Sequence, residues 1–402
     1  MTGVGGQQPR GNETRAAEFV ARARALRPFL RARAAECEAA RRVGDAAIAK
    51  LREARLFDVV KPRRYGGAEL GWDAFAEVVV ALSAGCGSTG WVYSVVGGHA
   101  PVVVRFGTCF LDELWGPKPD ALLSSCRRAS GALTPVDGGY RGSAVGIFSS
   151  GVHHVDWVLI EGMPVAGRDQ ALTVAVPRSE IEILDTWNAI GLAGTGSHDI
   201  RFDDVFIPDH RVWYPGKKPV GEALDGPLFR LPFLGGPFAL PAVALGVAIA
   251  GLEHFVATTH HRTNRTGASM ADQPPMQARI GESAMEIDAA LALLRAKLKE
   301  LMLSLAGETL DQTAERHVLL PGGAAHGYDA AAGCFIAQSA YRALDRLMSA
   351  AGAHQLAYSE PFQRCFRDAL GATQQPSNNW DNGRIAGGRA LLDRVKGWRI
   401  KG

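Results

Sequence analysis

The order of three stretches with different residue patterns constrains this fold most. From Arg15 to about residue 120, Ala, Arg, Leu and Glu dominate and apolar residues recur at three- and four-residue spacing, which indicates helices. Over 121–215, short β-rich runs alternate with Gly, Pro and Asp turns. Over 236–395, long helical segments return. This order predicts an α+β chain, mostly α, with an N-terminal helical domain, a middle antiparallel β-domain and a C-terminal helical bundle.

Within these stretches, individual elements can be predicted. We expect a disordered Gly/Gln-rich tail over 1–14, which lacks the apolar core of a signal peptide. The expected strands are Tyr140–Phe148, Trp157–Glu161, Leu172–Val176 and Ile200–Ile207. The expected long helices are Ala239–Thr263, Met276–Ala306 and Ala324–Ala351.

Charge and cysteine usage exclude several classes of protein. The 44 basic and 41 acidic residues nearly balance at a net charge of +3, which argues against a dedicated nucleic-acid or anionic-membrane surface. The six cysteines show no CxxC pair and no metal-ligand spacing, which is typical of a reduced, cytoplasmic protein.

One segment has to be weighed as a membrane span. Leu231 to Leu252 carries no charge over 22 residues, but it contains three prolines and four glycines. A transmembrane helix is more often rich in Leu, Ile and Val. We therefore expect a loop that leads into a buried, tightly packed helix, and no membrane contact.

Several nucleotide and hydrolase motifs are absent. No GxGxxG opens a strand–turn–helix unit, and no GxxxxGK[ST], HExxH or GxSxG occurs in the sequence. A Rossmann nicotinamide site, nucleotide hydrolysis, and zinc or serine hydrolysis therefore lose their usual support.

Two clusters of small polar residues lie in the β-region. In 185–199, Gly194 and Gly196 permit close backbone approach and Thr195 and Ser197 supply hydroxyls, a combination suited to an anionic or multiply accepting ligand. The alternative for this segment is a plain Gly-rich hairpin. In the second cluster, Ser149 and Ser150 precede Gly151 and could donate to a planar heterocycle, or could form a capped β-turn. The adjacent His153 and His154 lack metal-ligand spacing, so we predict no metal site.

A third cluster belongs to the N-terminal helices. Trp91 follows Gly85-Cys86-Gly87-Ser88-Thr89-Gly90, and His99 comes eight residues after it. Eight residues are about two helical turns, so both side chains could share one face and line a site. The alternative is that both are ordinary core residues.

Taken together, these clusters resemble a known family. The stretches "LFDVVKPRRYGG…GCGSTGWVYSVVGGH", "GGYRGSAVGIFSSGVHHVDWVLI", "DTWNAIGLAGTGSHDIRFDDVFIPDHR" and "EPFQRCFRDALGATQQPSNNWD" resemble the two-component aromatic hydroxylases of the acyl-CoA dehydrogenase fold, in order, from about residue 15 to 395. The resemblance implies a C-terminal four-helix bundle and a homotetramer. It also implies reduced FMN or FAD, delivered by an NAD(P)H-dependent flavin reductase, and O₂ as co-substrate.

The resemblance also assigns roles to residues. Ser150 would bond the flavin near N5 and steady its oxygenated form, while His99 and Gln375 would lie on the substrate side. Gln375 stands where related hydroxylases carry a histidine, and an amide cannot exchange a proton near neutral pH. Ala193 replaces a usual arginine. The residues expected to bind the flavin are Trp91, Ser149, Ser150, Thr195, Gly196 and Ser197, together with Arg262 and Gln277 at a subunit boundary.

The implied function is oxygenation of a small aromatic or polyketide-like substrate through a flavin C4a-hydroperoxide. An aromatic carbon is the first choice for the oxidised atom; an indole, an amine or a sulfur remains open. One alternative is an acyl-CoA dehydrogenase, which needs a carboxylate base, but no glutamate lies between Cys365 and Asp381. The other is a non-catalytic flavin-binding subunit.

Overall fold

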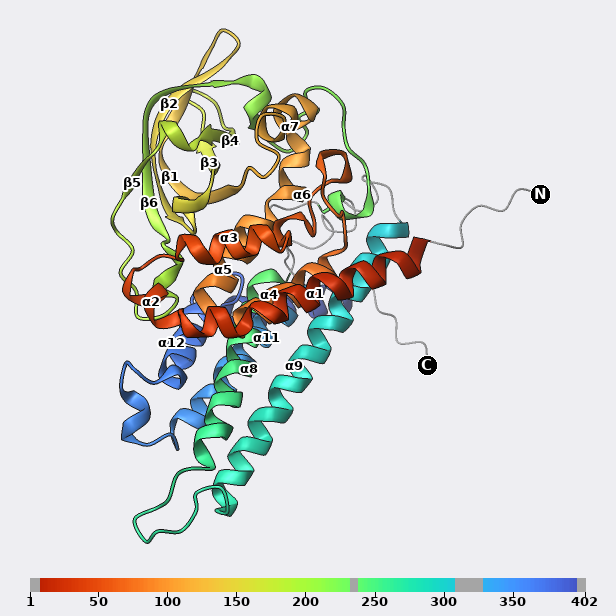
Figure 1. Ribbon diagram of the computed structural model, residues 1–402. Coiled ribbons are helices and arrows are strands. Elements are labelled where there is room, and N and C mark those ends of the chain that lie inside the picture. Colours follow the sequence, from red (N-terminus) through yellow and green to blue (C-terminus); the bar gives the residue numbers. More distant parts are fainter. Residues whose placement is uncertain (1–7, 232–237, 308–327, 396–402) are drawn as a thin grey trace, which may run out of the picture.

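The N-terminal helices occupy the middle of the molecule (Figure 1) in the computed structural model, which describes residues 8–231, 238–307 and 328–395. Helix α4 is buried along most of its length and packs against α1, α5 and α8. The bounds are α1 Gln8–Ala32, α2 Ala34–Ala39, α3 Asp45–Glu53, α4 Trp72–Ser83, α5 Gly87–Gly98, α6 Ala100–Val103 and α7 Thr108–Trp115. Because α1 begins at Gln8, residues 8–14 are helical and do not belong to the disordered tail that we predicted.

The middle of the chain forms one seven-stranded sheet in the order β5-β6-β2-β1-β3-β4-β7. The prediction of a purely antiparallel sheet is wrong at one pair, because β1 runs parallel to β3. The first two strands form a hairpin through Asp137-Gly138, with Gly138 at φ +74°, as expected for a two-residue turn. The strands are β1 Leu123–Val136, β2 Gly139–Ser149, β3 Trp157–Pro164, β4 Ala171–Pro177, β5 Glu182–Leu184, β6 His198–Pro208 and β7 Val212–Trp213.

The four predicted strands correspond to β2, β3, β4 and β6, each slightly longer than expected. Strand β1 was not among the predicted runs. Its sequence, LSSCRRASGALTPV, mixes Ser, Arg and Gly, and it owes its conformation to pairing with β2 on one side and β3 on the other. Tertiary pairing thus overrides local preference in this strand.

The C-terminal region is helical, as predicted, and lies at the opposite end of the molecule from the sheet (Figure 1). Helix α8 packs against α4, α5, α11 and α12, and α11 also packs against α9 and α13. The bounds are α8 Ala239–Thr259, α9 Pro274–Gly307, α11 Tyr328–Met348, α12 Pro361–Thr373 and α13 Trp380–Val395. The expected start of the third long helix, 324–327, lies outside the described residues.

Helix α8 is the one helix of the described residues that is long and apolar enough to cross a membrane by composition. Most of that helix is buried against its neighbours, which confirms the prediction of a tightly packed core helix. Small residues allow this packing: a Cβ built on Gly246 would lie 2.4 Å from the carbonyl O of Val80 in α4.

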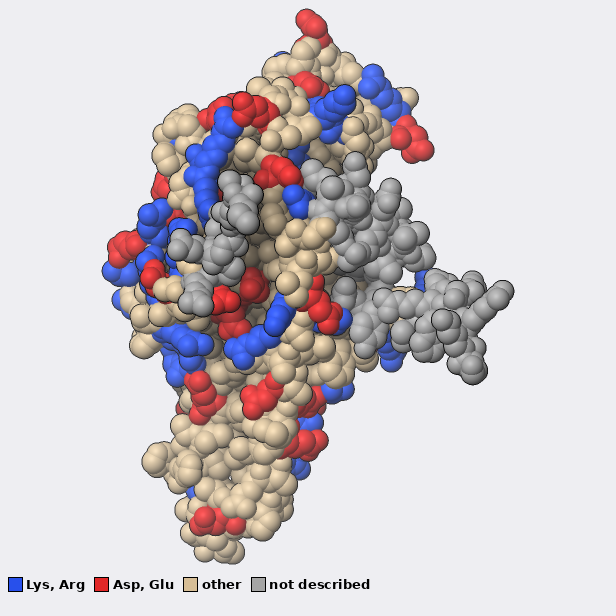
Figure 2. Space-filling model, turned by 90° about the vertical axis from the view of Figure 1, so that its right-hand side faces the viewer, with Lys and Arg blue, Asp and Glu red and all other residues tan. Residues whose placement is uncertain are grey.

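The charge pattern of the surface also follows the composition. On the face shown in Figure 2, acidic and basic side chains are interspersed, and neither sign dominates it. The lower tip of that face is largely uncharged.

The α4–α8 contact yields a stability prediction. Gly246→Ala should lower the free energy of unfolding by about 1–3 kcal/mol, because the added methyl group pushes two packed helices apart. Gly281→Ala in α9 is the matched control, since a Cβ at Gly281 meets nothing within 4 Å. It should raise stability by roughly 0.5–1 kcal/mol through helix propensity. Urea denaturation checks both; a shift in the same direction for both variants would contradict the packing argument.

Candidate functional site

The end of strand β2 is bent so that a serine hydroxyl leaves the plane of the sheet. Phe148 adopts a left-handed conformation at φ +60°, which is uncommon for a bulky residue, and its carbonyl accepts a hydrogen bond from the Ser150 N–H at 3.0 Å. Gly151 follows at φ +73°, where a Cβ would lie 2.7 Å from Cγ1 of Val92 in α5. The bend therefore places Ser150 directly against helix α5.

Four side chains join here in a continuous row of hydrogen bonds. Trp91 Nε1 donates to Ser150 Oγ at 3.2 Å, and Ser150 Oγ lies 2.7 Å from Ser197 Oγ. Ser197 Oγ in turn lies 2.7 Å from Thr195 Oγ1, which donates to the carbonyl O of Leu192 at 2.8 Å. All four side chains are buried. We call this row the hydroxyl relay.

The two ends of the hydroxyl relay determine the direction of every bond in it. The Leu192 carbonyl can only accept, so Thr195 uses its proton there and must accept from Ser197. Because Ser197 donates its only hydroxyl proton to Thr195, it must accept a hydrogen bond from Ser150. The hydroxyl proton of Ser150 is therefore directed at Ser197. At the other end the Trp91 indole N–H can only donate. A hydroxyl oxygen has two lone pairs, and Trp91 uses one, so Ser150 Oγ keeps one lone pair as an acceptor.

Helix α12 anchors the loop that carries Thr195 and Ser197. Asp368 Oδ1 accepts a hydrogen bond from the Leu192 N–H at 2.6 Å, and a Cβ on Gly191 would lie 1.9 Å from the Arg367 carbonyl O. Leu192 itself is left-handed at φ +51°. Burial raises the pKa of Asp368 to about 7, against the lowering effect of the Leu192 N–H.

Salt bridges fix α12 in place. Arg364 Nε donates to Glu38 of α2 at 2.9 Å, and Arg367 pairs with the other oxygen of the same carboxylate. Arg367 also donates to the Ile190 carbonyl at 2.5 Å. The pKa of Glu38 lies below its usual value because the two guanidinium groups outweigh the cost of its burial. Helices α2 and α12 and the loop therefore form one connected support.

Two aromatic residues lie next to the relay: Phe148 comes two residues before Ser150, and Trp187 Nε1 donates to the Leu192 carbonyl O at 3.3 Å. The side chain of Phe148 is 59% exposed, and its ring lies 6.1 Å from the Trp187 ring in an edge-to-face arrangement. Exposed aromatic surface beside a buried hydrogen-bonding group is complementary to a flat heterocycle that carries a polar edge. The lone pair on Ser150 fits a donor on that edge, which is what N5–H of a reduced flavin offers.

The side chains of the other predicted residues do not form hydrogen bonds within the relay. Ser149 is the last residue of β2, and its hydroxyl bonds that of Ser124 at 3.0 Å, so it does not join the relay. Gly196 allows the turn between Thr195 and Ser197 at φ +55°. His99 is buried at the end of α5, and its Nδ1 donates to the Leu123 carbonyl O at 3.2 Å.

Three further predicted residues, Gln375, Arg262 and Gln277, also lie outside the relay. Gln375 is half-buried in the turn after α12, and its Oε1 accepts hydrogen bonds from the N–H and hydroxyl of Ser377. Arg262 and Gln277 lie in or next to the connection between α8 and α9, at the end of the molecule remote from the sheet (Figure 1). Their predicted contact is with a neighbouring subunit, and it stays a prediction.

Sequence reasoning missed Asp368 and Phe148 as parts of the site. Asp368 was not among the predicted site residues, although an acidic residue on the apolar face of a helix is itself a signal. Among the described residues, no group of three or more His, Cys, Asp or Glu side chains is arranged to hold a metal ion.

Known proteins are similar to this chain in both sequence and fold. The family "Acyl-CoA dehydrogenase, N-terminal domain" matches residues 15–118, and "Acyl-CoA dehydrogenase, C-terminal domain" matches 238–379. The chain is 33% identical over 390 residues to the FADH(2)-dependent resorcinol hydroxylase, oxygenase component, of Rhizobium sp., covering 93% of this chain and 94% of that protein.

Two solved structures are similar over nearly the whole chain. The 3-HSA hydroxylase from Rhodococcus sp. RHA1 superposes with a TM-score of 0.83 at 28% identity, over 96% of this chain and 98% of that one. XiaF from Streptomyces sp., solved with FADH2 and glycerol, gives 0.82 at 26% identity, over 96% and 97%.

The buried His99 predicts a pH dependence of stability. Burial lowers its pKa to about 4, against about 6.5 in the unfolded chain. The stability that neutral His99 contributes is therefore complete above pH 6.5 and is lost as the pH falls toward 4, because the unfolded chain takes up the proton first. His99→Gln should flatten the pH dependence of the free energy of unfolding in this window, by up to about 1.4 kcal/mol per pH unit. Urea denaturation at pH 7, 6 and 5 measures it.

The exposed His354 supplies the control for this experiment. His354→Gln should leave the slope of stability against pH as it is in the parent protein. Equal slopes for the parent protein and His99→Gln would mean that His99 takes up its proton as readily in the folded chain as in the unfolded one.

Proposed function

This chain belongs to the acyl-CoA dehydrogenase family, among its flavin-dependent monooxygenases, and from that premise we propose that it oxygenates a small electron-rich aromatic compound. It is an oxidoreductase and an oxygenase component, which uses reduced flavin and O₂ and depends on a separate flavin reductase. The substrates named for its relatives, resorcinol and p-hydroxyphenylacetate, are phenols, which supports a phenolic or similarly activated ring.

The single observation that carries the proposal is the direction of the hydroxyl relay. Oxidised flavin presents N5 as an acceptor, whereas reduced flavin presents N5–H as a donor. Because Ser150 donates to Ser197, its free lone pair can accept from N5–H but its proton is not available to oxidised N5. The relay therefore supports binding of the reduced cofactor, the form that an oxygenase component must take up.

The bound flavin would supply the electrons that activate O₂ and pass one oxygen atom to the substrate. The chain's own residues would bind the flavin and enclose it. Ser150 would keep the proton on N5, and Trp91 would keep Ser150 in place by its indole N–H. Phe148 would support the ring system. Burial of the relay keeps water from competing for these bonds.

We extend the proposal to the assembly and its location. A homotetramer, joined through a C-terminal four-helix bundle, is supported by Arg262, which is half-buried with its Nη1 lacking a hydrogen-bond partner, and whose Nη2 donates to the Ala350 carbonyl at 3.3 Å. Such a guanidinium fits the flavin phosphate of a neighbouring subunit, and Gln277 would line the same subunit boundary. The six free cysteines support a reduced cytoplasmic location.

An acyl-CoA dehydrogenase activity is less well supported. That reaction needs a carboxylate that can reach the α-proton of a thioester. Asp368 is the one carboxylate that lies between Cys365 and Asp381, and it is buried and bonded to the Leu192 backbone. Gln375 does not exchange protons near neutral pH, so we propose a substrate that needs no deprotonation by that residue.

Anaerobic titration tests the function directly. The purified protein should bind FMNH₂ or FADH₂ more tightly than the oxidised flavin, and adding air with a phenolic substrate should give hydroxylated product. Bleaching of bound oxidised flavin by an acyl-CoA would instead indicate a dehydrogenase. Binding of reduced flavin without any product from a panel of phenols, indoles and sulfides would indicate a non-catalytic subunit.

Variants of the hydroxyl relay test its direction. In Thr195→Val, Ser197 loses its acceptor and can turn to donate to Ser150, whose proton then becomes available to oxidised N5. The ratio of the Kd for oxidised flavin to that for reduced flavin should fall about tenfold, the factor for one reversed hydrogen bond of about 1.4 kcal/mol. Ser150→Ala should increase the hydrogen peroxide formed per reduced flavin consumed.

Thr173→Val is the matched control, because Thr173 is a buried threonine of strand β4, outside the relay. Its Kd ratio should equal that of the parent protein. If Thr195→Val also leaves the ratio unchanged while the fold is intact, the relay does not govern recognition of the flavin's redox state.

A further inference from the structure

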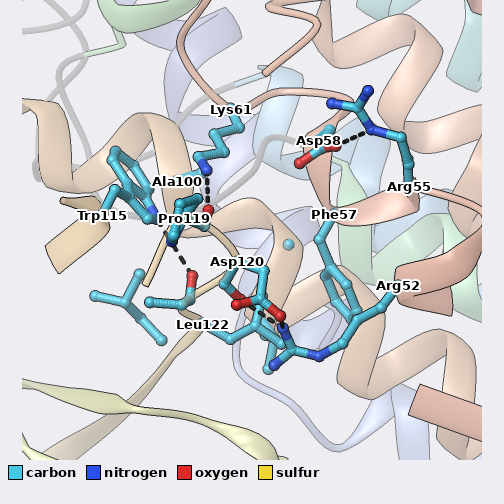
Figure 3. Close-up of a pocket in the computed structure, with 14 residues that line it drawn as sticks. Arg52, Arg55, Phe57, Asp58, Lys61, Ala100, Trp115, Pro119, Asp120 and Leu122 are labelled. Atoms are coloured by element: carbon cyan, nitrogen blue, oxygen red, sulfur yellow. Dashed lines mark hydrogen bonds and ion pairs between the residues drawn. The ribbon is translucent and has the colours of Figure 1, made fainter. Parts of the chain in front are cut away.

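A partly open cavity lies beside helix α5 in the N-terminal domain, and no residue of the hydroxyl relay lines it (Figure 3). It has a volume of about 240 Å³ and lies between η1 (Leu56–Asp58), helices α5 to α7 and the start of β1. Its apolar walls are Phe57, Val96, Gly97, Ala100, Trp115, Pro119, Ala121, Leu122 and Leu123. The proposed function makes no use of this space.

Most charges around the cavity neutralise one another. Arg55 pairs with Asp58 at 2.7 Å, and Arg52 pairs with the carboxylate of Asp120, as the dashed lines in Figure 3 show. Lys61 is the fifth charged residue of the lining. Three cations against two anions leave a net charge of +1, and Lys61 is the cation that the two ion pairs leave over.

Lys61 is placed unusually for a lysine. Lys61 is only 5% exposed. Its Nζ points toward Pro119 and donates a hydrogen bond to the carbonyl of that residue (Figure 3). The Nζ also lies 4.9 Å from the centre of the Trp115 ring. No ion pair of Lys61 is formed with the described residues, and burial lowers the pKa of its ammonium group, against the raising effect of the Asp58 and Asp120 carboxylates. A buried ammonium group of this kind is stabilised by an anion beside it.

The size of the cavity limits what that anion can be. A dry cavity of about 150 Å³ in another protein holds one benzene molecule, so about 240 Å³ holds one ring with a small substituent. The rings of Phe57 and Trp115 form part of the wall, which suits a flat aromatic group. A small inorganic anion would leave these walls uncovered.

We propose that this cavity is a second small-molecule site that binds a single-ring aromatic carboxylate, with the ring between the apolar walls and the carboxylate at Lys61. The site is separate from the relay but adjacent to it. Val96 lines the cavity, and its Cγ2 would be 3.3 Å from a Cβ on Gly151, the residue after Ser150. Leu123, whose carbonyl accepts from His99, also lines the cavity. A bound ring would therefore press on two elements that carry residues of the candidate site.

Calorimetric titration of the flavin-free protein tests the site independently of flavin chemistry. Benzoate is the probe, benzamide is its uncharged isostere, and acetate carries the charge without the ring. Benzoate should bind at least about tenfold more tightly than either. Equal affinity for benzamide would overturn the role of Lys61, and equal affinity for acetate would overturn the role of the ring.

Two variants remove the two determinants separately. Lys61→Met keeps the volume and removes the charge; Ala100→Leu keeps the charge and fills the space. Each should weaken benzoate binding about tenfold or more. The control Lys50→Met removes an exposed lysine that does not line the cavity, and the affinity of this variant for benzoate should equal that of the parent protein. Melting temperatures identify any variant that fails to fold.

A third variant locates the bound probe. Ser150→Ala lies outside the cavity and should retain benzoate binding. Loss of binding in Ser150→Ala, with normal binding in Lys61→Met and Ala100→Leu, would place benzoate at the relay and refute the second site. Failure of the chain to bind reduced flavin would refute the proposed function and leave this result intact.

Discussion

The hydrogen bond between Asp368 and the Leu192 N–H is the contact on which the candidate site depends. It joins helix α12 of the C-terminal region to the loop of the β-domain, while Asp368 also packs against Gly87 at the start of α5. Leu192 is in addition the last acceptor of the hydroxyl relay. The position of Ser150 therefore depends, through three further hydrogen bonds, on where a helix far along the chain is anchored.

Much of the fold could be predicted from local patterns. Alternating apolar runs located β2, β3, β4 and β6, and the small residues of the uncharged segment correctly indicated a packed helix at α8. Strand β1 and its parallel pairing with β3 could not be predicted, because its residues lack an apolar alternation and its partners are distant in sequence. Residues 8–14 of α1 were mistaken for a tail because they contain no apolar residue that could show helical periodicity.

The site was predictable in part. Trp91, Ser150, Thr195 and Ser197 come from three segments and meet in one row, while their contacts with a flavin stay a prediction. Ser149 does not join them, because its hydroxyl bonds that of Ser124 in β1. The role of Asp368 required knowledge of a contact 176 residues apart in the chain. The direction of the relay could not be read from sequence either, since it follows from which groups can only accept or only donate.

The hydroxyl relay is built entirely from an indole, three hydroxyls and a backbone carbonyl, none of which gains or loses a proton at physiological acidity. Its polarity is consequently set by covalent chemistry and not by the medium. A histidine or carboxylate in the same place would take up a proton when the pH fell. It would then change from acceptor to donor, and the direction of the hydrogen bonds would reverse. With the arrangement found here, the preference of Ser150 for a donating partner is the same in an acidified cell as in an alkaline one.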